Sequence, residues 1–546
     1  MAKPHDNDPE RRPRKHRGHR PRMPQPEQVS QVSGRILDPG SAVPPASNRR
    51  GETVELLPTV YVGDRLIVSK AVDFDKAFRV IRETANALDW DAKETRDRVN
   101  EKLKFGVRTI ELFIDKKVVA TAPDAWVVLQ QARRQDADAV KGVSLDHVVF
   151  DSPYTEGHPY TEGHPYTEGH PYTEGHTPTS SYAVPGSGGL QPIAYTGPGP
   201  ERGKVEPRRP VVAVLDTGCG KHPWLDGVVK TGVKLDGHPI GFDHTVPDSE
   251  RDGDTIGALD GLLDPHAGHG TFISGLVLQN CPDVEILSWR ILPPDGPVSE
   301  YQWVTALAQI AELVRRYQEG LPGGHPIDVL TMSIGYYHES PEDELFDLGL
   351  YAVLEELGKR GVVMVCSAGN DATERENFPA AFAPWKDGKG PVKPSIRQAP
   401  VVSVGSLNPN GTTALFSNSG AWVRAYERGA AVFSTMPPFQ GGLLPEARTR
   451  AAGRRRETVD PDDFRDPEHR GGFAVWSGTS FAAPVVAGKI AKELTPFLRF
   501  GDEPRTARLR GWMAVAATTP ITMPDDVQEE DRAALSDGGP SDPSTD

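Results

Sequence analysis

From residue 211 onward, runs of consecutive hydrophobic residues alternate with segments of helical periodicity. The apolar runs are predicted to form strands, at residues 211–216, 284–292, 328–334, 362–369 and 401–407. Runs without polar interruption suit strands that are buried on both faces. The segments of helical periodicity lie between or after them, at residues 269–279, 301–320, 343–361 and 476–494. This alternation predicts an α/β fold with a mostly parallel sheet flanked by helices on both faces.

A smaller pattern of the same kind precedes it. Residues 54–69 and 107–114 are predicted to be extended. Residues 73–88 begin with an Asp cap and continue with apolar residues at helical spacing, and 123–133 open with Pro and Asp. Both features are typical of helix starts. Residues 52–150 are therefore predicted to form a small N-terminal α/β domain.

Composition assigns the remaining segments to arms and linkers. The chain contains 55 Gly and 51 Pro, and only 37% of its 546 residues are hydrophobic. Such values indicate long stretches that do not belong to a packed core. The predicted organisation adds a disordered basic arm at 1–51, a linker at 151–209 and a large domain at 210–500. A helical extension at 501–523 and an acidic disordered tail at 524–546 follow.

The linker contains the hexapeptide PYTEGH four times without a substitution, over residues 153–176. Its prolines fix φ and favour an extended, polyproline-like path. At about 3.1 Å per residue, the repeat would span about 75 Å. It is therefore interpreted as a tether for the small domain, with weak zinc or nickel binding by its histidines as the alternative.

Charge and cysteine content bear on partners and compartment. Residues 1–23 carry eight Lys/Arg and three acids, but no aromatic residue interleaves them and the net charge of the chain is −15. A solvated arm is therefore favoured over nucleic-acid binding. The three cysteines lack C-x-x-C spacing, which indicates reduced thiols. Without a secretory signal or an apolar run of about 18 residues, the chain is predicted to be cytoplasmic and to have no membrane partner.

Three short motifs place polar residues at the ends of predicted strands and helices. Asp216 ends a strand before a Gly-rich turn, His269 lies between two glycines at a helix start, and Ser480 lies at the N-terminus of another helix. Each has a structural interpretation when taken alone: a turn former, a structural histidine and a helix cap. The order Asp, His, Ser along the chain is that of the subtilisin catalytic arrangement.

The motifs DTG (216–218), GHGT (268–271) and GTSFAAP (478–484) resemble the three catalytic signatures of the subtilisin-like serine proteases. Further matches lie between them, at TMSIG (331–335), SAGND (367–371) and VVSVGSL…FSNSG (401–420). The resemblance covers about 210–495. It implies a subtilisin-like fold and a serine endopeptidase that acts on proteins or peptides without requiring a cofactor.

The resemblance also implies roles for individual residues. Ser480 would be the nucleophile, His269 the general base, and Asp216 the residue that orients the imidazole. Asn370 and the backbone N–H of Ser480 would form the oxyanion hole. The remaining implied positions bind substrate: Ser333, Ile334 and Gly335 along its backbone, and Ala368 and Gly369 as the wall of the pocket.

Several features depart from the family's pattern. Phe272 follows GHGT where the family usually has a second histidine, so packing beneath His269 is expected to differ. The charged segment 437–475 precedes the Ser480 motif and is interpreted as a solvated insertion, with a lid as the alternative. The acidic run 248–255 has oxygen ligands at alternate positions but lacks a closing glutamate, so calcium binding stays open there.

Two questions about function remain open at this level. The small domain is interpreted as a regulator, either an inhibitor resembling the family's propeptides or a domain that recruits a partner. The alternative to an active peptidase is a catalytically restrained scaffold or recruitment protein built on the same fold. A nucleotide-binding protein is disfavoured, because TGCGKHP after the first strand is not a G-x-G-x-x-G loop.

Overall fold

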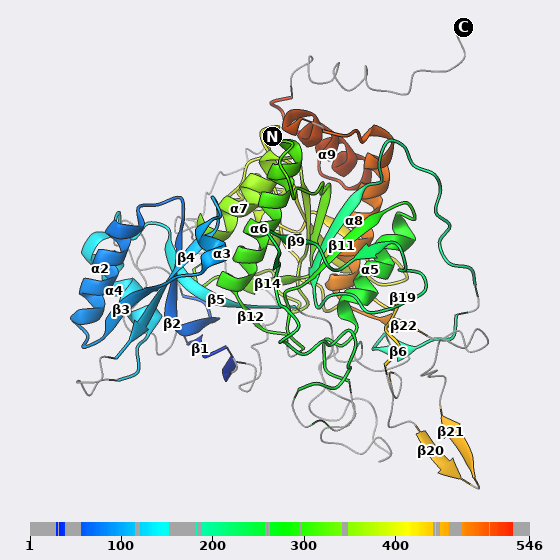
Figure 1. The fold of residues 1–546 in the computed structure, drawn as a ribbon, viewed down its shortest axis with the longest axis horizontal. Coiled ribbons are helices and arrows are strands. Elements are labelled where there is room, and N and C mark those ends of the chain that lie inside the picture. The colour runs from blue at the N-terminus through cyan, green and yellow to red at the C-terminus, as the bar shows by residue number, and fades with distance from the viewer. Residues whose placement is uncertain are drawn as a thin grey trace, which may run out of the picture.

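A computed structural model provides the three-dimensional description. It describes residues 29–38, 56–114, 121–151, 188–256, 263–340, 348–439, 448–457 and 472–527, apart from single positions within these ranges, together with residues 182, 259 and 443. The chain forms a small domain (34–151) and a large domain (188–527) that lie side by side (Figure 1). The PYTEGH repeats, most of the basic arm and most of the acidic tail lie outside the described residues.

The large domain is built on a seven-stranded parallel sheet. Its strands in spatial order are β18 (Ala425–Arg428), β17 (Val401–Leu407), β15 (Val363–Ser367), β13 (Val329–Met332), β7 (Val211–Asp216), β11 (Glu285–Arg290) and β8 (Val229–Lys230). All neighbouring strands run parallel. The five predicted apolar runs supply its central strands, because strands covered on both faces are apolar at every position.

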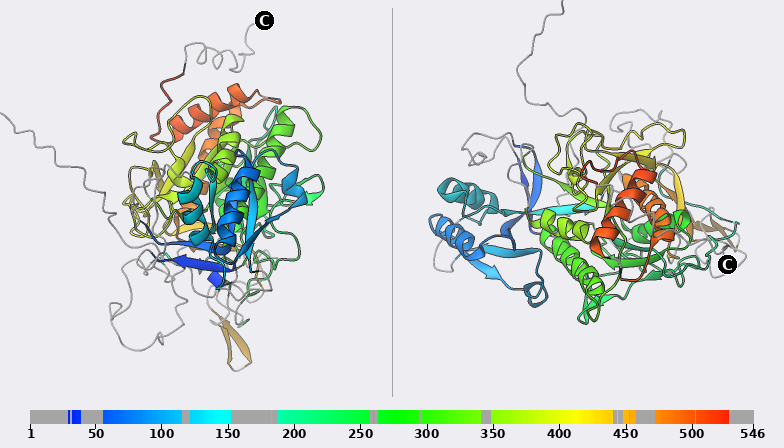
Figure 2. Two further views of the ribbon diagram at one scale, coloured as in Figure 1. Left: turned by 90° about the vertical axis from the view of Figure 1, so that its left-hand side faces the viewer. Right: turned by 90° about the horizontal axis from the view of Figure 1, so that it is seen from above.

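Helices cover both faces of this sheet, which confirms the predicted fold class. On one face lie α6 (Glu300–Gln318) and α7 (Leu348–Lys359); on the other lie α5 (His269–Asn280), α8 (Thr479–Leu494) and α9 (Pro504–Thr518) (Figures 1 and 2). Along β7, Ala213 and Leu215 pack with α6 and α7, whereas Val212 and Val214 pack with α5 and α8. This alternation follows from the opposite directions of successive side chains in a strand.

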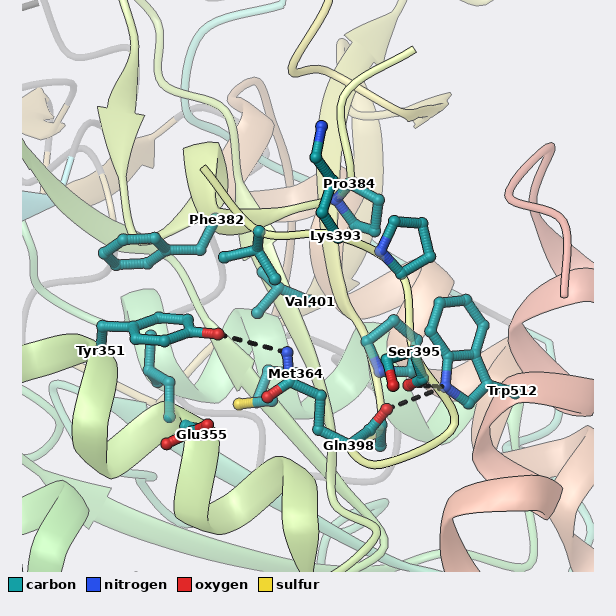
Figure 3. Close-up of a pocket in the computed structure, with 15 residues that line it drawn as sticks. Tyr351, Glu355, Met364, Phe382, Pro384, Lys393, Ser395, Gln398, Val401 and Trp512 are labelled. Atoms are coloured by element: carbon teal, nitrogen blue, oxygen red, sulfur yellow. Dashed lines mark hydrogen bonds between the residues drawn. The ribbon is translucent and has the colours of Figure 1, made fainter. Parts of the chain in front are cut away.

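Helix α9 corresponds to the predicted C-terminal extension and packs onto the large domain. The indole Nε1 of Trp512 donates hydrogen bonds to the backbone carbonyls of Ser395, at 3.2 Å, and Gln398, at 2.8 Å (Figure 3). The Gln398 side chain in turn donates to the Tyr351 hydroxyl of α7. Trp512 is 1% exposed. This buried and hydrogen-bonded indole makes α9 part of the core of the large domain.

The small domain has the split βαβ topology. Its elements are β2 (Thr59–Ser69), α2 (Phe74–Asn86), β3 (Asp91–Thr95), a short α3 (Arg98–Glu101), β4 (Val107–Phe113), α4 (Ala125–Asp136) and β5 (Val143–Asp151). The strands form an antiparallel sheet in the order β5-β2-β4-β3. This chain order and strand order define a ferredoxin-like fold. Asp73 and Asp124 cap α2 and α4, as their sequences predict.

Two predicted boundaries of the small domain need correction. Within the arm predicted to be disordered, β1 (Gly34–Leu37) pairs with β2 and extends the sheet. At the other end, β5 was not predicted from the sequence, and it carries the sheet through Asp151 into the predicted linker. The described end of that linker, residues 188–209, belongs to the large domain, where β6 (Gln191–Pro192) pairs with β22 (Phe473–Trp476).

The two domains share one sheet through β5. This strand lies between β12 (Val298–Ser299) and β14 (Ile334–Tyr337) of the large domain and pairs antiparallel with both. Figure 1 shows β5 reaching from the small domain toward these two strands. The run predicted as a single strand over 328–334 is therefore divided at Ser333. Its first part stays in the parallel sheet as β13, and its second part joins the shared sheet as β14.

The small domain also covers helices of the large domain. Leu66 and Val68 of β2 pack with α2 and α4, whereas Ile67 between them packs into the core that contains α6 and α7. In the view from above, the small domain lies on the side of α6 and α7, away from α9 (Figure 2). The sheet of the small domain is thus buried on both faces, with its own helices on one side and those of the large domain on the other.

The remaining described elements are short. They are β9 (Lys234–Leu235), β10 (His238–Pro239), β16 (Asn377–Phe378), β19 (Val432–Thr435), β20 (Arg448–Ala451), β21 (Arg454–Glu457), and the 3₁₀ turns Ala380–Phe382 and Thr495–Phe497. β20 and β21 pair as a hairpin within the charged insertion 437–475. Among the described helices, none has both the length and the apolar character needed to cross a bilayer.

Candidate active site

Asp216, His269 and Ser480 come from three different elements at one edge of the parallel sheet. Asp216 ends β7, His269 begins α5, and Ser480 lies in the first turn of α8. The carboxyl ends of parallel strands form the edge at which α/β proteins place their sites. Asp216 and His269 are 0% exposed and Ser480 is 1% exposed. All three residues are therefore buried, although 264 positions separate the first from the last.

A short hydrogen bond joins the carboxylate and the imidazole. Asp216 Oδ1 lies 2.7 Å from His269 Nδ1 and also accepts the backbone N–H of Thr217 at 2.8 Å. The imidazole ring packs against aromatic rings on either side of Ser480, with its centroid 5.8 Å from that of Trp476 and 5.3 Å from that of Phe481. The contact with Asp216 uses Nδ1, so Nε2 is the nitrogen directed away from the carboxylate.

Ser480 lies at the N-terminal end of a helix. It occupies the first turn of α8, whose unpaired N–H groups and dipole favour an anion. Its Oγ makes no hydrogen bond to any residue that the structure describes, and its backbone carbonyl accepts a hydrogen bond of 3.0 Å from Ser333 Oγ. Pro484 lies inside the helix and has no N–H to donate to the carbonyl of Ser480 four residues earlier, so that carbonyl is bonded by Ser333 instead.

Asn370 is held in one orientation by the residue before Ser480. Its Oδ1 accepts the backbone N–H of Thr479 at 2.8 Å and the Thr479 hydroxyl at 2.9 Å. The Thr479 hydroxyl also accepts the backbone N–H of Gly369 at 3.1 Å. Because the amide oxygen accepts both hydrogen bonds from Thr479, the NH₂ group is the donor end of Asn370. The SAGND segment and the start of α8 are thus fixed to each other.

The predicted substrate-binding positions lie around these residues. Ile334 and Gly335 belong to β14, and both are already paired with β5, Ile334 with Asp151 and Gly335 with Phe150. Ala368 is buried, and Gly369 has a φ of +97°, a conformation that favours glycine. The structure thus places Ser333 beside the Ser480 carbonyl and the other two positions of its segment against the small domain.

Asn418 is hydrogen-bonded to the SAGND segment, and this role was not identified from the sequence. Its side-chain NH₂ donates to the carbonyl of Ala368 at 2.8 Å, and its Oδ1 accepts the backbone N–H groups of Asp371 and Thr373. It is 0% exposed. The FSNSG motif contains this residue, so the signal was present, but a buried asparagine can be assigned a partner only after the chain is folded.

Glu250 is a second buried carboxylate behind the Asp216–His269 pair, and it too was missed. Its Oε1 accepts the Thr217 hydroxyl and the backbone N–H of Gly270, the latter at 2.9 Å, and its Oε2 accepts the Thr271 hydroxyl. It therefore ties the DTG motif to the GHGT motif. Glu250 belongs to the acidic run 248–255 considered for calcium. In the structure its side chain is buried rather than exposed to solvent.

Glu250 is expected to make stability depend on pH. Burial raises the pKa of its carboxyl from 4.5 to about 7. The folded state then holds a proton that the unfolded state releases, so the free energy of unfolding should fall by about 3 kcal/mol as pH rises from about 4.5 to about 7. In denaturant unfolding across this range, Glu250→Gln should lack that fall, while the exposed Glu201→Gln should keep it. Equal pH dependence in wild type and Glu250→Gln would contradict this role.

Phe272 and Cys219, which lie next to the site, are both in packed surroundings that suit a structural role. Phe272 is fully buried and packs against Phe481, with ring centroids 4.6 Å apart, and against Trp476. It thus fills the space beneath His269. The Cys219 thiol lies 4.0 Å from the Thr271 hydroxyl, and burial raises its pKa to about 12. A thiol held in its protonated form is a poor nucleophile.

Comparison with known proteins identifies the family. The model of the subtilase family of peptidases matches residues 208–517, more than half of the chain. The chain belongs to the subtilase family. The match ends one residue before the last residue of α9, so it extends beyond the predicted domain boundary at residue 500.

Individual relatives are distant and match only part of the chain. An intracellular serine protease of Paenibacillus polymyxa is 23% identical over 51% of this chain and 65% of its own length. Mycosin-4 of Mycobacterium tuberculosis is 26% identical over 51% of this chain and 54% of its length. The human membrane-bound transcription factor site-1 protease is 28% identical over 51% and 20%. The chain thus spans less than two-thirds of each of these relatives.

Solved structures give the same kind of match. Fervidolysin from Fervidobacterium pennivorans, a keratinolytic enzyme related to subtilisin, aligns at 19% identity with a TM-score of 0.44, covering 82% of this chain and 57% of that one. A cold-adapted subtilisin-like serine proteinase aligns at 20% identity with a TM-score of 0.33, covering 58% and 84%.

Proposed function

We propose that this chain is a serine endopeptidase that hydrolyses peptide bonds of proteins or peptides through an acyl-enzyme. The observation that supports it most directly is the buried 2.7 Å contact between Asp216 Oδ1 and His269 Nδ1, with the imidazole packed against Phe481, the residue after Ser480. A carboxylate that holds an imidazole in this way orients its other nitrogen for proton transfer. The family of the chain agrees with this chemistry.

In the proposed reaction, Ser480 Oγ attacks the carbonyl carbon of the peptide bond. His269 Nε2 takes the hydroxyl proton and then gives it to the leaving amine, while Asp216 stabilises the imidazolium. Water hydrolyses the acyl-serine ester with His269 again acting as the base. Each proton that leaves one group is received by a named group, so the cycle returns Ser480 and His269 to their starting states.

The negative charge that forms on the carbonyl oxygen requires donors that are already in place. The Asn370 NH₂ group and the backbone N–H of Ser480 are proposed to supply them. The hydrogen bonds from Thr479 to Asn370 Oδ1 fix the amide in advance, so little reorganisation accompanies charge formation. Ala368 and Gly369, joined to the same network, are proposed to line the pocket beside this oxygen.

We propose further that the small domain restrains the peptidase by occupying its substrate edge. Ser333, Ile334 and Gly335 would bind substrate backbone as an added strand. In the structure β5 pairs with Ile334 and Gly335 on one side and with β12 on the other. An extended substrate and β5 would therefore compete for the same backbone groups. This arrangement supports an inhibitory role of the small domain more directly than recruitment of a partner.

Loosening β5 is expected to increase reactivity at Ser480. Val149 is 0% exposed, pairs with Val298 and packs into the core around α6. An aspartate there would lose about 1.5–3 kcal/mol of burial and add a desolvation cost, so docking should weaken by at least about tenfold. The labelling rate with a fluorophosphonate probe should rise accordingly. Ile36→Asp, at a position 48% exposed on β1, should leave the rate unchanged, and equal rates for all three proteins would contradict restraint.

The same probe tests the peptidase itself. Labelling of wild type or of Val149→Asp that is lost on Ser480→Ala supports an active enzyme. The occupied edge of β14 also favours a second candidate, a catalytically restrained scaffold or recruitment protein. Absence of labelling in both proteins, at a concentration that labels a reference serine hydrolase, would favour that scaffold.

The compartment is proposed to be the cytoplasm. Cys219, Cys281 and Cys366 are all free, and burial raises the pKa of each thiol. Unpaired buried thiols suit a reducing compartment. Cell fractionation that recovers the chain only with secreted or periplasmic proteins would contradict this proposal.

A further inference from the structure

A buried cluster of two histidines and two glutamates lies at the junction of the two domains. His147 belongs to β5 of the small domain, Glu300 begins α6, and His338 and Glu339 directly follow β14. Their exposed fractions are 0%, 0%, 6% and 2%. Ionisable groups at this depth require partners. None of the four belongs to the proposed catalytic residues.

The contacts within the cluster centre on His147 and Glu339. Glu339 Oε2 lies 2.9 Å from His147 Nε2 and 3.4 Å from His338 Nδ1. On its other side, His147 Nδ1 lies 2.7 Å from Glu300 Oε2. The His147 ring is stacked on Tyr336, with centroids 4.5 Å apart. The imidazole is therefore fixed in orientation, with one nitrogen toward Glu300 and the other toward His338 and Glu339.

These positions fit the donors of a small divalent cation. Ligand atoms of His147, His338 and Glu339 all lie within 4.8 Å of one another, and in the described part of the chain no other set of three does so. Nitrogen and oxygen atoms bound at about 2.0–2.2 Å to tetrahedral Zn²⁺ lie about 3.3 Å apart. The distances from Glu339 Oε2 to His147 Nε2, 2.9 Å, and to His338 Nδ1, 3.4 Å, lie on either side of that value.

Two charged residues beside the cluster have partners of their own. Asp146, next to His147, is paired with Arg65 at 2.5 Å. Arg375 donates to the backbone carbonyl of His338 at 2.7 Å, and its guanidinium lies over the Tyr337 ring. Glu339 Oε1 is buried without a hydrogen bond to any described residue. The Glu339 carboxylate thus keeps one oxygen that no described residue uses, besides the Oε2 atom that faces the two histidines.

We propose that His147, His338 and Glu339 bind one Zn²⁺ ion, with Glu300 as the hydrogen-bond acceptor that orients His147. A carboxylate on the second nitrogen of a metal-bound histidine is the common arrangement around zinc. A water molecule would complete the tetrahedron. One ligand comes from the small domain and two come from the segment that follows β14, so the ion would bind the domains to each other.

The consequence for activity rests on the proposed restraint by β5, but the binding of zinc does not. The segment that follows β14 also receives two other contacts from the small domain: Leu57 N donates to Glu339 O, and Thr59 Oγ1 donates to Tyr337 O. Zinc at this point would hold β5 in place along Gly335. The metal would thereby strengthen the docked state by the free energy of its preferential binding to that state.

Metal binding by the full-length chain tests the site directly. The chelator-treated protein is titrated with Zn²⁺ in a calorimeter, and Co²⁺ is used as a spectroscopic substitute. Wild type should bind one ion tightly, His147→Gln and Glu339→Gln should lose this binding by at least tenfold, and Glu300→Gln should weaken it about 10–100-fold. Ser480→Ala should bind as wild type does, so failure of the peptidase proposal would not affect the result.

Two controls separate this site from other histidines. His325→Gln removes a half-buried histidine that lies 3.5 Å from Glu285, and it should bind zinc as wild type does. Substitution of His158, His164, His170 and His176 by alanine removes the histidines of the repeat and should leave the tight site intact. Loss of tight binding in the repeat variant, equal binding by His147→Gln and wild type, or absence of tight binding in wild type would overturn the proposal.

Discussion

Replacing Ser480 with alanine is expected to lower the hydrolysis of a peptide substrate by about 10⁶-fold, since losses of this size follow removal of the nucleophile or base in a subtilisin. The variant should keep its fold, because Ser480 Oγ makes no hydrogen bond to any described residue. Adding His269→Ala to it should cause almost no further loss, because nucleophile and base act as one unit. Asp216→Asn alone should cost about 10⁴-fold, since it changes the tautomer that the imidazole adopts.

A neighbouring serine provides the matched control for Ser480. Ser477 is also buried, and its hydroxyl donates to the carbonyl of Gly188 at 2.6 Å and accepts the backbone N–H of Ala431. Ser477→Ala should therefore lower the unfolding temperature while changing kcat far less than Ser480→Ala. If both variants lost hydrolysis equally and in proportion to lost fold, Ser480 would have a structural role and the nucleophile assignment would fail.

The residues of the candidate site could be predicted from sequence because they lie in short motifs at the ends of regular elements. Asp216, His269 and Ser480 each end a strand or begin a helix, and such positions follow from periodicity. The parallel sheet brings these ends together. The distances between these residues, such as the 2.7 Å between Asp216 Oδ1 and His269 Nδ1, could be known only from the structure.

Strand β5 was not predicted because it contains two polar residues that are buried at the junction of the two domains. Asp146 and His147 interrupt its apolar run, and charged residues argue against a buried strand. Both are fully buried, because Arg65 pairs with Asp146 and the large domain supplies Glu300 and Glu339 to His147. Glu300 and Glu339 lie 153 and 192 positions from His147 in the chain, so local sequence patterns cannot show that they are its partners.

The division of residues 328–334 and the role of Glu250 were hidden for related reasons. Nothing in the apolar run shows that the chain leaves the parallel sheet at Ser333, because β14 finds its partners in β5 and β16, which are distant in sequence. Glu250 lies in an acidic run that suits a solvated loop, yet its carboxylate accepts hydrogen bonds from Thr217, Gly270 and Thr271. Periodicity predicts the layers of a fold, whereas the partners of buried polar groups depend on tertiary contacts.

Replacing Asn370 with alanine is expected to lower kcat by about 10²–10³-fold, which corresponds to about 3–4 kcal/mol of transition-state stabilisation. KM should change little, because the donor acts on the charge that exists only after attack by Ser480. The measurement is steady-state hydrolysis of a peptide, with each variant also made in Val149→Asp so that β5 restrains none of them. The exposed Asn410→Ala should behave as wild type does.

Thr479→Val provides a graded version of the same experiment. It removes the hydroxyl that donates to Asn370 Oδ1 at 2.9 Å but keeps the backbone N–H that donates at 2.8 Å. The amide would then be less firmly oriented but still present, so kcat should fall by about tenfold, less than in Asn370→Ala. A loss in Thr479→Val that equalled or exceeded that of Asn370→Ala would show that Thr479 acts on α8 and Ser480 directly. An unchanged kcat in Asn370→Ala would mean that the oxyanion is bound by backbone N–H groups alone.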